Sequence, residues 1–550
     1  MNNSHFYPQV VEKSGKSMSD QDTTPDKVET KKVAVIPPEF IFPFVLVTTL
    51  FALWGFANDI TNPLVKAFKD VFVISNKQSS FVQMAFYGGY ATMALPAAIF
   101  IRKVSYKAGL IVGLLLYGIG ALMSWPAASM ASFDLFLIAL YILTFGLAFL
   151  ETTANPYILS MGPEKTATRR LNFAQAFNPI GSLTGMSVAI FAILSSLQVQ
   201  EFRDDVAQYR NDRASEVREV KVSKAPEEKE PRGIDVNLLA YLEAEEARRE
   251  APLSAEQMEQ VKRKELSIDD ETNSLADVSY DTVLTKALTE YKAGNIATFR
   301  GKTHGELEEH DLAVVRTPYV AIGLVVLGVM LLFVFCKLPK AGDAPGDVDL
   351  FATFGRLITN FHYTGGVVAQ AFYVGAQIMC WTFIIHYATD LLGMTLAEAQ
   401  GYNVIAMVIF CSSRFVCTYL LKYVSPTGLL TALALGAMAC TLGAIFIQGM
   451  LGLYCLIAIS ACMSLMFPTI YGIALEGLGE DAKLGSAGLI FAIVGGALMP
   501  PWQGSIIDGG RVAGLEGVRV SFFLPFVCFV ILALYGTIAN KIKPKHRRTV

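Results

Sequence analysis

Carboxylates and amides recur inside long apolar stretches of the sequence. Asp59 lies with Asn58 and Asn62 in one stretch, and Glu151 lies with Asn155 in another. Residues three or four positions apart share one face of a helix, so each set would form a polar stripe. A charge in the middle of a membrane costs at least about 2.5 kcal/mol, so a charge that is placed there usually has a task. Protonation removes that cost, so we predict that Glu151 and Asp59 carry a coupling proton.

Amides and one indole supply the groups that bind a sugar. Amides pair with hydroxyls as both donor and acceptor, and an indole face stacks on the C–H side of a sugar ring. The predicted substrate-binding set is Asn58, Asn62, Gln83, Asn155, Gln175, Asn178, Gln377 and Trp381.

Structural alternatives stay open for several of these residues. Amides in hydrocarbon can simply hold helices together. Asp59 could be a solvated residue at the membrane edge. Arg414 could act in gating, or it could anchor helix packing by binding backbone carbonyls. Arg102 and Lys103, in a basic loop between two apolar stretches, are predicted to act in gating or packing.

The apolar stretches have the length that crosses a bilayer, about 18 to 25 residues. Of the 550 residues, 53% are hydrophobic and only 17% are charged, whereas soluble domains average about 25% charged residues. This excludes a soluble enzyme for most of the chain. Twelve membrane-spanning helices are predicted at about 40–62, 79–101, 108–128, 133–158, 172–197, 318–337, 366–388, 402–421, 427–448, 451–474, 485–507 and 520–540.

The charges of the loops predict an orientation and a domain order. Lys and Arg gather in the loops at one end of the helices, which places that end and both termini in the cytoplasm of a plasma-membrane protein. Residues 201–310 hold 17 basic and 26 acidic residues, a net charge of −9, which favours solvated helix and loop over a packed domain. The predicted order is a disordered tail (1–37), helices 1–5 (38–197), an acidic extracellular insertion (198–316), helix 6 (317–337), a cytoplasmic loop (338–365), helices 7–12 (366–540) and a basic tail (541–550).

Several kinds of chemistry have no sequence signature here. There is no Gly-rich phosphate loop, HExxH motif or nucleophile elbow, and the eight cysteines include no CxxC pair, so we expect no catalytic residues, metal or cofactor. A net charge of −3 without a basic stripe excludes nucleic acid as a partner. The expected partners are a sugar, a proton and the lipid bilayer, and we expect a monomer.

At these residues the sequence resembles the fucose permease branch of the major facilitator superfamily. The resemblance covers about 40–195 and 317–540. Its blocks include Leu53-Trp-Gly-Phe-Ala-Asn58, Gln83-Met-Ala-Phe-Tyr-Gly-Gly-Tyr90, Leu150-Glu-Thr-Thr-Ala-Asn-Pro156, Leu171-Asn-Phe-Ala-Gln-Ala-Phe-Asn178 and Tyr373-Val-Gly-Ala-Gln377. It implies an all-α membrane protein of the major facilitator fold, with twelve transmembrane helices in two six-helix halves. It also implies proton-coupled import of L-fucose or a related hexose.

The resemblance assigns the protonatable glutamate of helix 4 to Glu151, and the sugar-contacting amides of helix 5 to Gln175 and Asn178. One departure stands out: the family's helix 1 aspartate aligns with Asn62, and the nearest acid is Asp59, one turn earlier on the same face. The prediction is therefore a sugar:proton importer that works by alternating access. The alternatives are an uncoupled facilitator for galactose, glucose or N-acetylglucosamine, and a sensor that binds sugar without transporting it.

Overall fold

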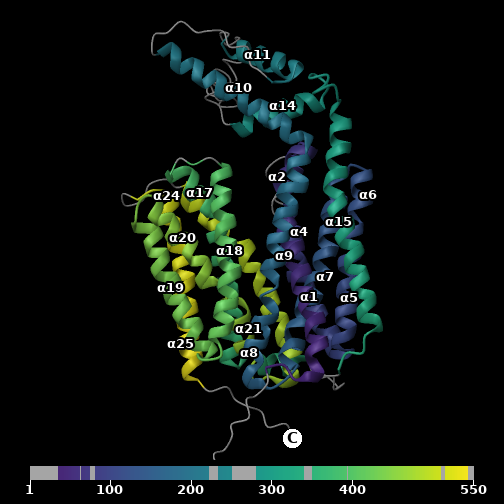
Figure 1. Cartoon of the computed structure of the whole chain (residues 1–550), viewed down its shortest axis with the longest axis vertical. Helices are drawn as coiled ribbons and strands as arrows, with labels where there is room; N and C mark the ends of the chain where they lie inside the picture. Colours follow the sequence, from purple (N-terminus) through teal and green to yellow (C-terminus); the bar gives the residue numbers. More distant parts are fainter. Residues whose placement is uncertain are drawn as a thin grey trace, which may run out of the picture. The chain divides into compact units, whose positions relative to one another are not determined.

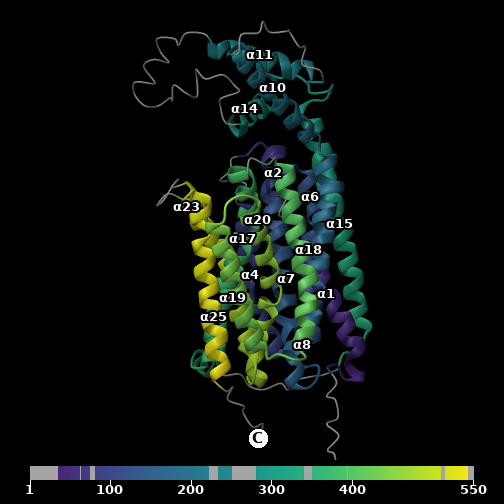
Figure 2. The same ribbon diagram turned by 60° about the vertical axis from the view of Figure 1, so that its left-hand side comes forward.

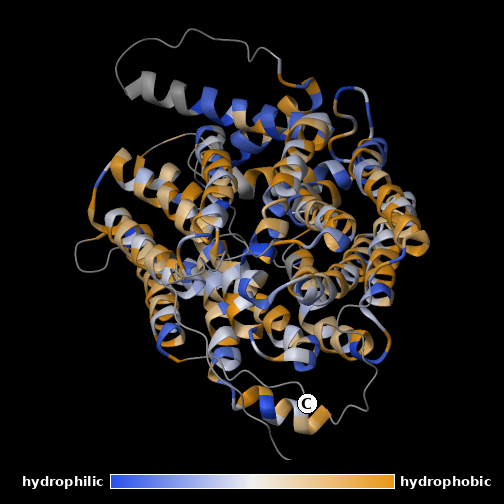
Figure 3. Ribbon diagram, turned by 60° about the horizontal axis from the view of Figure 1, so that its bottom comes forward, coloured by the Kyte–Doolittle hydropathy of each residue, from blue (hydrophilic) through white to orange (hydrophobic). Residues whose placement is uncertain are grey.

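The computed structural model describes residues 35–61, 64–74, 78, 81–221, 233–250, 280–339, 350–392, 394, 396–508 and 515–542. Within these ranges the chain is nearly all helical, and twelve helices are long and apolar enough to cross a membrane. Hydrophobic residues predominate along their ribbons (Figure 3). The predicted fold class is therefore confirmed. Residues 1–34 of the predicted tail, Asn62 and residues 543–550 lie outside the described ranges.

The first six crossings form one bundle, drawn from purple to teal in Figure 1. They are α1 (Ile41–Thr61), α4 (Phe81–Lys103), α5 (Tyr106–Leu122) with α6 (Ser124–Ser129), α7 (Phe133–Ser160), α8 (Ala167–Gln175) with α9 (Asn178–Val188), and α15 (His304–Phe335). The short helix α2 (Leu64–Phe72) follows α1. The helix that contains the predicted sixth span begins at His304, because Thr303 and Glu306 form a capping box there.

The last six crossings form a second bundle beside the first, drawn in green and yellow (Figures 1 and 2). They are α17 (Phe361–Leu392), α18 (Leu396–Leu420), α19 (Pro426–Phe446), α20 (Met450–Met463) with α21 (Met466–Leu475), α22 (Ala482–Phe491) with α23 (Gly495–Asp508), and α24 (Gly517–Ser521) with α25 (Phe523–Lys541). The helix α16 (Leu350–Ile358) lies in the segment between the bundles. The two bundles are called the N-half and the C-half below.

Several crossings are broken near their middle, and two of the breaks precede a proline. Pro179 follows the break between α8 and α9, and Pro468 follows the break between α20 and α21. Proline has no backbone N–H, so it removes the hydrogen bond to the carbonyl four residues earlier. Broken helices of this kind expose backbone groups where transporters bind their cargo.

Helices α1 and α9 pack with their backbones in direct approach. A Cβ atom on Gly55 would overlap the carbonyl oxygen of Asn178, and one on Gly181 would overlap the carbonyl oxygen of Ala52. Only glycine permits this approach at either position. The polar residues of α1 and of α9 are therefore held in one rigid unit.

The two halves meet at the end of the bundle that carries the basic loop after α4. Arg102 of the N-half donates a hydrogen bond to Asp481 of the C-half at 3.3 Å, and Arg356 donates two more to the same carboxylate at 2.8 Å. Arg102 thus lies where a gate is predicted. Lys103 is exposed and has no hydrogen bond or ion pair with a described residue, which gives its predicted gating role no support.

More contacts close the same end. The Glu164 carboxylate accepts a hydrogen bond from the backbone N–H of Gly477 at 3.0 Å. The Asn172 amide donates to the Thr469 hydroxyl at 3.2 Å, with both side chains fully buried. Each pair joins the N-half to the C-half, and together with the Arg102 contact they make up the closed end.

The described part of the insertion packs around an apolar core, which contradicts the prediction of solvated helix and loop for these residues. Its described helices are α10 (Gln198–Lys221), α11 (Val236–Glu250) and α14 (Tyr280–Lys292). The rings of Phe202 and Tyr291 stack with their centroids 5.5 Å apart. A buried apolar core surrounds them, formed by Val206, Leu238, Leu242, Leu284, Leu288, Ile296 and Phe299.

The insertion is fastened to the N-half. Arg203 of α10 forms an ion pair with Asp70 of α2 at 3.0 Å, and the Lys292 ammonium donates to the Phe72 carbonyl at 2.9 Å. The carboxylate of Asp311 in α15 accepts the backbone N–H groups of Gln198 and Val199, at 2.8 and 2.9 Å. These donors belong to the first turn of α10, so α15 caps that helix.

An ion-pair cluster ties α11 to α14 inside the insertion. The Glu245 carboxylate pairs with Arg248 at 2.8 Å, Arg249 at 3.0 Å and Lys286 at 2.8 Å. Burial raises the pKa of Glu245, but the hydrogen bonds from Arg248 and Lys286 outweigh it, and the pKa is lowered to about 2. The cluster therefore stays charged throughout the neutral range.

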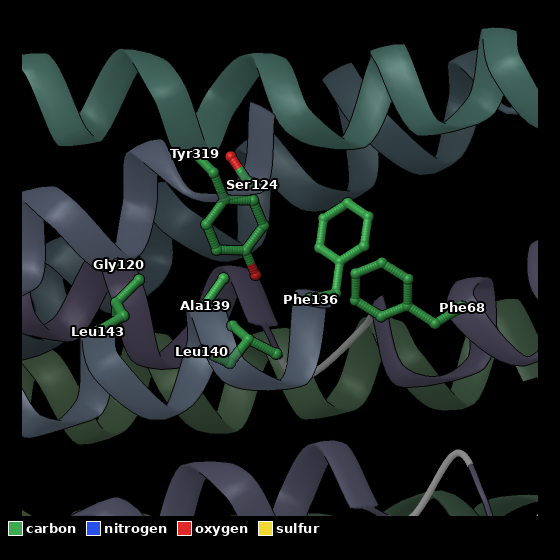
Figure 4. Close-up of a pocket in the computed structure, with 8 residues that line it drawn as sticks. All are labelled: Phe68, Gly120, Ser124, Phe136, Ala139, Leu140, Leu143 and Tyr319. Carbon is green, nitrogen blue, oxygen red and sulfur yellow. The ribbon is translucent and has the colours of Figure 1, made fainter. Parts of the chain in front are cut away.

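A small void lies inside the N-half, between α2, α5, α7 and α15 (Figure 4). Its volume is about 10 Å³, and its lining includes Phe68, Phe136 and Tyr319. The Tyr319 hydroxyl is 2.9 Å from the Thr61 hydroxyl, within hydrogen-bond distance. A water needs about 10–15 Å³ and several polar partners, so this void is a packing defect and has no room for a substrate.

Candidate functional site

A larger cavity lies between the two halves, with a volume of about 110 Å³. A water needs about 10–15 Å³ by the same measure, so the space suits a ligand of roughly ten non-hydrogen atoms, the size of a hexose. Its lining comes from α1, α4, α7, α8 and α9 of the N-half and from α17, α18, α21 and Ile493 of the C-half. Central sites between two repeats are typical of transporters.

Most of the predicted site residues meet in this cavity. The residues that line it are Asn58, Asp59, Glu151, Gln175, Asn178, Gln377, Trp381 and Arg414. Asn62 lies outside the described residues, and so does the side chain of Gln83, although its backbone belongs to α4. The remaining three residues, Asn155, Arg102 and Lys103, lie elsewhere.

Glu151 is an almost fully buried carboxylate, with 1% of its surface exposed. Neither of its carboxylate oxygens makes a hydrogen bond of good geometry with a described residue, and the Tyr90 hydroxyl lies beside the carboxylate, within interaction range. No ion pair with Glu151 occurs among the described residues. A carboxylate without a counter-ion can take up and release a proton without breaking a salt bridge.

Asp59 is also buried, with 6% of its surface exposed, and it lines the cavity beside Asn58. Tyr87 of α4 lies within range of electrostatic interaction with it. The alternative of a solvated residue at the membrane edge is therefore wrong. Asp59 faces the same space as Glu151.

Asn155 does not line the cavity, so the structure gives its predicted contact with substrate no support. It is fully buried one turn after Glu151, and its amide nitrogen donates to the Glu151 backbone carbonyl at 3.0 Å. Its side-chain oxygen accepts from the Gln175 amide at 2.7 Å. Asn155 therefore fixes the orientation of Gln175 and leaves the Gln175 side-chain oxygen for a ligand.

Asn178 is held in a similar way by the neighbouring helix. Its amide nitrogen donates to the Phe51 carbonyl of α1 at 3.2 Å. Its side-chain oxygen has no hydrogen bond with a described residue and belongs to the cavity lining. Asn178 and Gln175 thus each offer one acceptor to the cavity, on the two sides of the break between α8 and α9.

The C-half contributes an indole and an amide from α17. The Trp381 N–H donates to the Ser460 hydroxyl at 3.2 Å, and the ring meets Phe410 edge to face with centroids 4.9 Å apart. These contacts fix the plane of the indole. Gln377 lies one turn earlier on α17, lines the cavity and makes no hydrogen bond with a described residue, so its amide is open to a ligand.

Arg414 of α18 lies in the cavity wall, with 3% of its surface exposed. Its guanidinium lies 4.6 Å from the centroid of the Phe410 ring. It donates to the Ser464 carbonyl and, at 3.0 Å, to the Gln175 carbonyl. The carbonyl contacts expected of a packing anchor are present, and one of them crosses to the N-half.

Aromatic side chains complete the lining and were missed from the sequence. They are Trp54, Tyr87, Tyr90, Tyr373, Phe410 and Phe467. Tyr87 and Tyr90 are three residues apart on α4, so the spacing alone could have placed both on one helix face. An aromatic wall with a few convergent amides suits a sugar ring, which has one apolar face and a polar rim.

Comparisons with known proteins agree with this architecture. The model of the Major Facilitator Superfamily matches residues 46–200. The chain is 47% identical to the L-fucose-proton symporter of Haemophilus influenzae, over 92% of this chain and 99% of that protein. It is 32% identical to the L-fucose-proton symporter of Escherichia coli, over 90% of this chain and 93% of that protein.

A solved structure is similar along the same length. The superfamily transporter FucP, crystallised in the outward conformation, matches with a TM-score of 0.68 and 30% identity, over 91% of this chain and 99% of that one. The similarity thus extends through both halves. The chain belongs to the fucose permease family of the major facilitator superfamily.

Proposed function

We propose that the protein imports L-fucose or a related hexose together with a proton, by alternating access. The observation that carries the proposal is Glu151, a buried carboxylate without a counter-ion, in the wall of a hexose-sized cavity. The names of the two relatives, both L-fucose-proton symporters, support the substrate and the coupling ion.

The arrangement of side chains suits sugar binding. Gln175 and Asn178 offer fixed acceptors from the N-half, and Gln377 offers an unbonded amide from the C-half. Trp381 presents a ring whose plane is fixed by Ser460 and Phe410. A hexose would stack on the indole and bond to amides of both halves, so its binding would favour closure of the halves around it.

The proton acts through Glu151. When the halves exchange access, an ionised Glu151 would have to remain buried without a counter-ion, at a cost of at least about 2.5 kcal/mol. A protonated Glu151 avoids this cost, so reorientation of the loaded carrier is favoured only after a proton is bound. Sugar and proton affinities are then linked through the state that both stabilise.

The loop charges support the orientation. The closed end carries Arg102, Lys103, Lys165 and Arg170, and the positive-inside rule places such an end in the cytoplasm. The described conformation then faces outward, the insertion is extracellular, and both termini are cytoplasmic in a plasma membrane. The carrier works as a monomer, because one chain supplies both halves of the cavity.

Uptake into vesicles tests the proposal. Purified protein in proteoliposomes receives labelled L-fucose, D-galactose, D-glucose or N-acetylglucosamine, with and without an acid-outside gradient. We expect L-fucose to accumulate only with the gradient, and addition of L-fucose without a gradient to make the outer medium more alkaline. Equilibration without accumulation would instead indicate an uncoupled facilitator. Sugar binding without uptake would indicate a sensor.

A further inference from the structure

Two prolines leave two backbone carbonyls without helical partners, and both carbonyls lie beside the Arg414 guanidinium. Pro179 removes the N–H that would bond to the carbonyl of Gln175, four residues earlier. Pro468 does the same for the carbonyl of Ser464. Gln175 is the last residue of α8, and Ser464 is the C-cap of α20. Each carbonyl carries the partial negative charge of a helix C-terminus.

The guanidinium of Arg414 serves both carbonyls. Its Nε donates to the Ser464 carbonyl and its Nη1 donates to the Gln175 carbonyl at 3.0 Å. An arginine fork can hold two acceptors at once in a fixed geometry, which a lysine cannot. Nearly complete burial, with 3% of the residue exposed, strengthens both bonds.

The two bonds differ in what they join. Arg414 and Ser464 both belong to the C-half, so their bond lies inside one rigid unit. Gln175 belongs to the N-half, so the second bond joins the halves. The bond to Gln175 lies in the cavity wall. From Gln175, α8 runs back to Thr168, whose side chain lies against Gly472 of α21 at the closed end.

We propose that Arg414 is a positioning residue that latches the two halves at the floor of the cavity, through the carbonyl that Pro179 leaves open. The inference rests on the alternating access proposed above and adds a further group that holds the outward-facing state closed on its cytoplasmic side. The same bond fixes the backbone of Gln175, whose side chain faces the cavity. The latch must therefore release when the halves rock to the inward-facing state.

A matched pair of proline variants separates a latch from simple packing. Pro179→Ala restores an N–H that can bond to the Gln175 carbonyl, and so competes with Arg414 for the bond between the halves. Pro468→Ala does the same for the Ser464 carbonyl, inside the C-half. The reporter is Thr168→Cys in a background that lacks the eight native cysteines, labelled with an impermeant maleimide from the cytoplasmic side of inverted vesicles.

We expect Pro179→Ala and Arg414→Gln to raise the labelling rate of Cys at position 168 by about tenfold, the effect of losing one hydrogen bond with a charged donor. Pro468→Ala should leave the rate within about twofold of the parent. Arg414→Lys, which keeps the charge but can hold only one carbonyl well, should give an intermediate rate.

Unchanged labelling in both Pro179→Ala and Arg414→Gln would overturn the latch. Equal increases in the two proline variants would also overturn it, and would return Arg414 to a packing role. Folding of each alanine variant is judged by its elution as a single monodisperse peak. Should either variant fail this criterion, the two Arg414 variants decide: a smaller rise in labelling for Arg414→Lys than for Arg414→Gln supports the latch, and equal rates overturn it. Labelling needs no sugar or proton gradient, so a carrier that fails the uptake test can still pass or fail this one.

Discussion

The two halves of the cavity wall differ in their chemistry. The N-half supplies both carboxylates, Asp59 and Glu151. It also supplies the amides of Gln175 and Asn178, on either side of the break between α8 and α9. The described lining of the C-half holds no carboxylate; it supplies the indole of Trp381, the ring of Phe410 and the guanidinium of Arg414. Under the proposed function, this division assigns proton chemistry to the N-half, and shaping of the sugar and closure of the halves to the C-half.

Each half holds its polar groups on closely packed helices. The direct approach of α1 and α9 at Gly55 and Gly181 holds the polar groups of the N-half in one unit. The C-half has a comparable approach of α17 and α23 at Gly495, where a Cβ atom would overlap the carbonyl oxygen of Ala371, and its indole is held by the contact of Trp381 with Ser460. Because both carboxylates belong to the N-half, substitutions of them should damage coupling outright, whereas substitutions in the C-half should change sugar affinity by degrees.

The largest effect is expected at Glu151. Glu151→Gln mimics permanent protonation, so it should abolish accumulation of sugar driven by a proton gradient and preserve exchange of labelled for unlabelled sugar. Asp134→Asn, an exposed carboxylate on the same helix, is the control and should leave both activities intact. Normal uphill uptake by Glu151→Gln would show that the proton is carried elsewhere.

The second largest loss of transport is expected on substitution of Asp59. Because its carboxylate is buried in the cavity wall, Asp59→Asn should lower initial uptake about tenfold, as expected when a charged hydrogen-bonding group is lost. The exchange Asp59→Asn with Asn62→Asp should recover part of it, because both positions share one helix face. The measurement is uptake across several pH values, normalised to protein in the membrane. A loss of less than about twofold would remove Asp59 from the site.

The third largest effect is expected at the two amides beside the break between α8 and α9. Gln175→Ala and Asn178→Ala each remove a hydrogen bond to the sugar, which weakens binding by about 5- to 150-fold. Asn155→Ala removes only the partner that orients Gln175, so it should cost less. The double variant Asn155→Ala with Gln175→Ala should bind no worse than Gln175→Ala alone. Additive losses in a titration calorimeter would instead give Asn155 a contact of its own.

A smaller effect is expected from the indole of the C-half. Trp381→Phe keeps an aromatic face but loses area and the bond to Ser460, so affinity should fall by about 2- to 12-fold. The proton:sugar stoichiometry should stay unchanged, because no proton-carrying group is altered. A change of stoichiometry in this variant would contradict the division of roles between the halves.

The smallest effect should come from the insertion. Replacing residues 200–302 with a short Gly/Ser linker keeps the Gln198 and Val199 contacts to Asp311, and loop closure adds little free energy. Sugar affinity should change by less than about twofold. Protease added outside intact cells should cut the wild-type insertion. Cleavage only after the membrane is opened would reverse the proposed orientation.

The sequence predicts the helices well because a helix that crosses the hydrocarbon layer must be a long apolar run. It also identifies most of the cavity wall, because a polar residue in such a run is usually stabilised only where it faces the interior of the protein. Spacing along one helix cannot show which helix lies opposite. Spacing therefore predicts a sugar contact for Asn155, on the same face as Glu151, and cannot show that its side-chain oxygen accepts a hydrogen bond from Gln175.

The packed insertion shows a different failure. Its high charge suggested a solvated segment, yet Phe202, Val206 and Tyr209 follow an i, i+4, i+7 pattern, and Leu284, Leu288 and Tyr291 follow the same pattern on α14. That periodicity marks a buried helix face. Net charge describes the solvent side of a helix and says little about the opposite side.

The fastening of the insertion has a mechanical consequence. Its ties, through Asp70, Phe72 and Asp311, all lead to helices of the N-half, and α15 continues from the membrane into it as one helix of 32 residues. A rocking of the N-half would therefore swing the insertion as a lever arm, with the largest displacement far from the pivot. A small rotation at the cavity becomes a large excursion outside the membrane, where a bound antibody fragment or a pair of dyes could follow single transport cycles in real time.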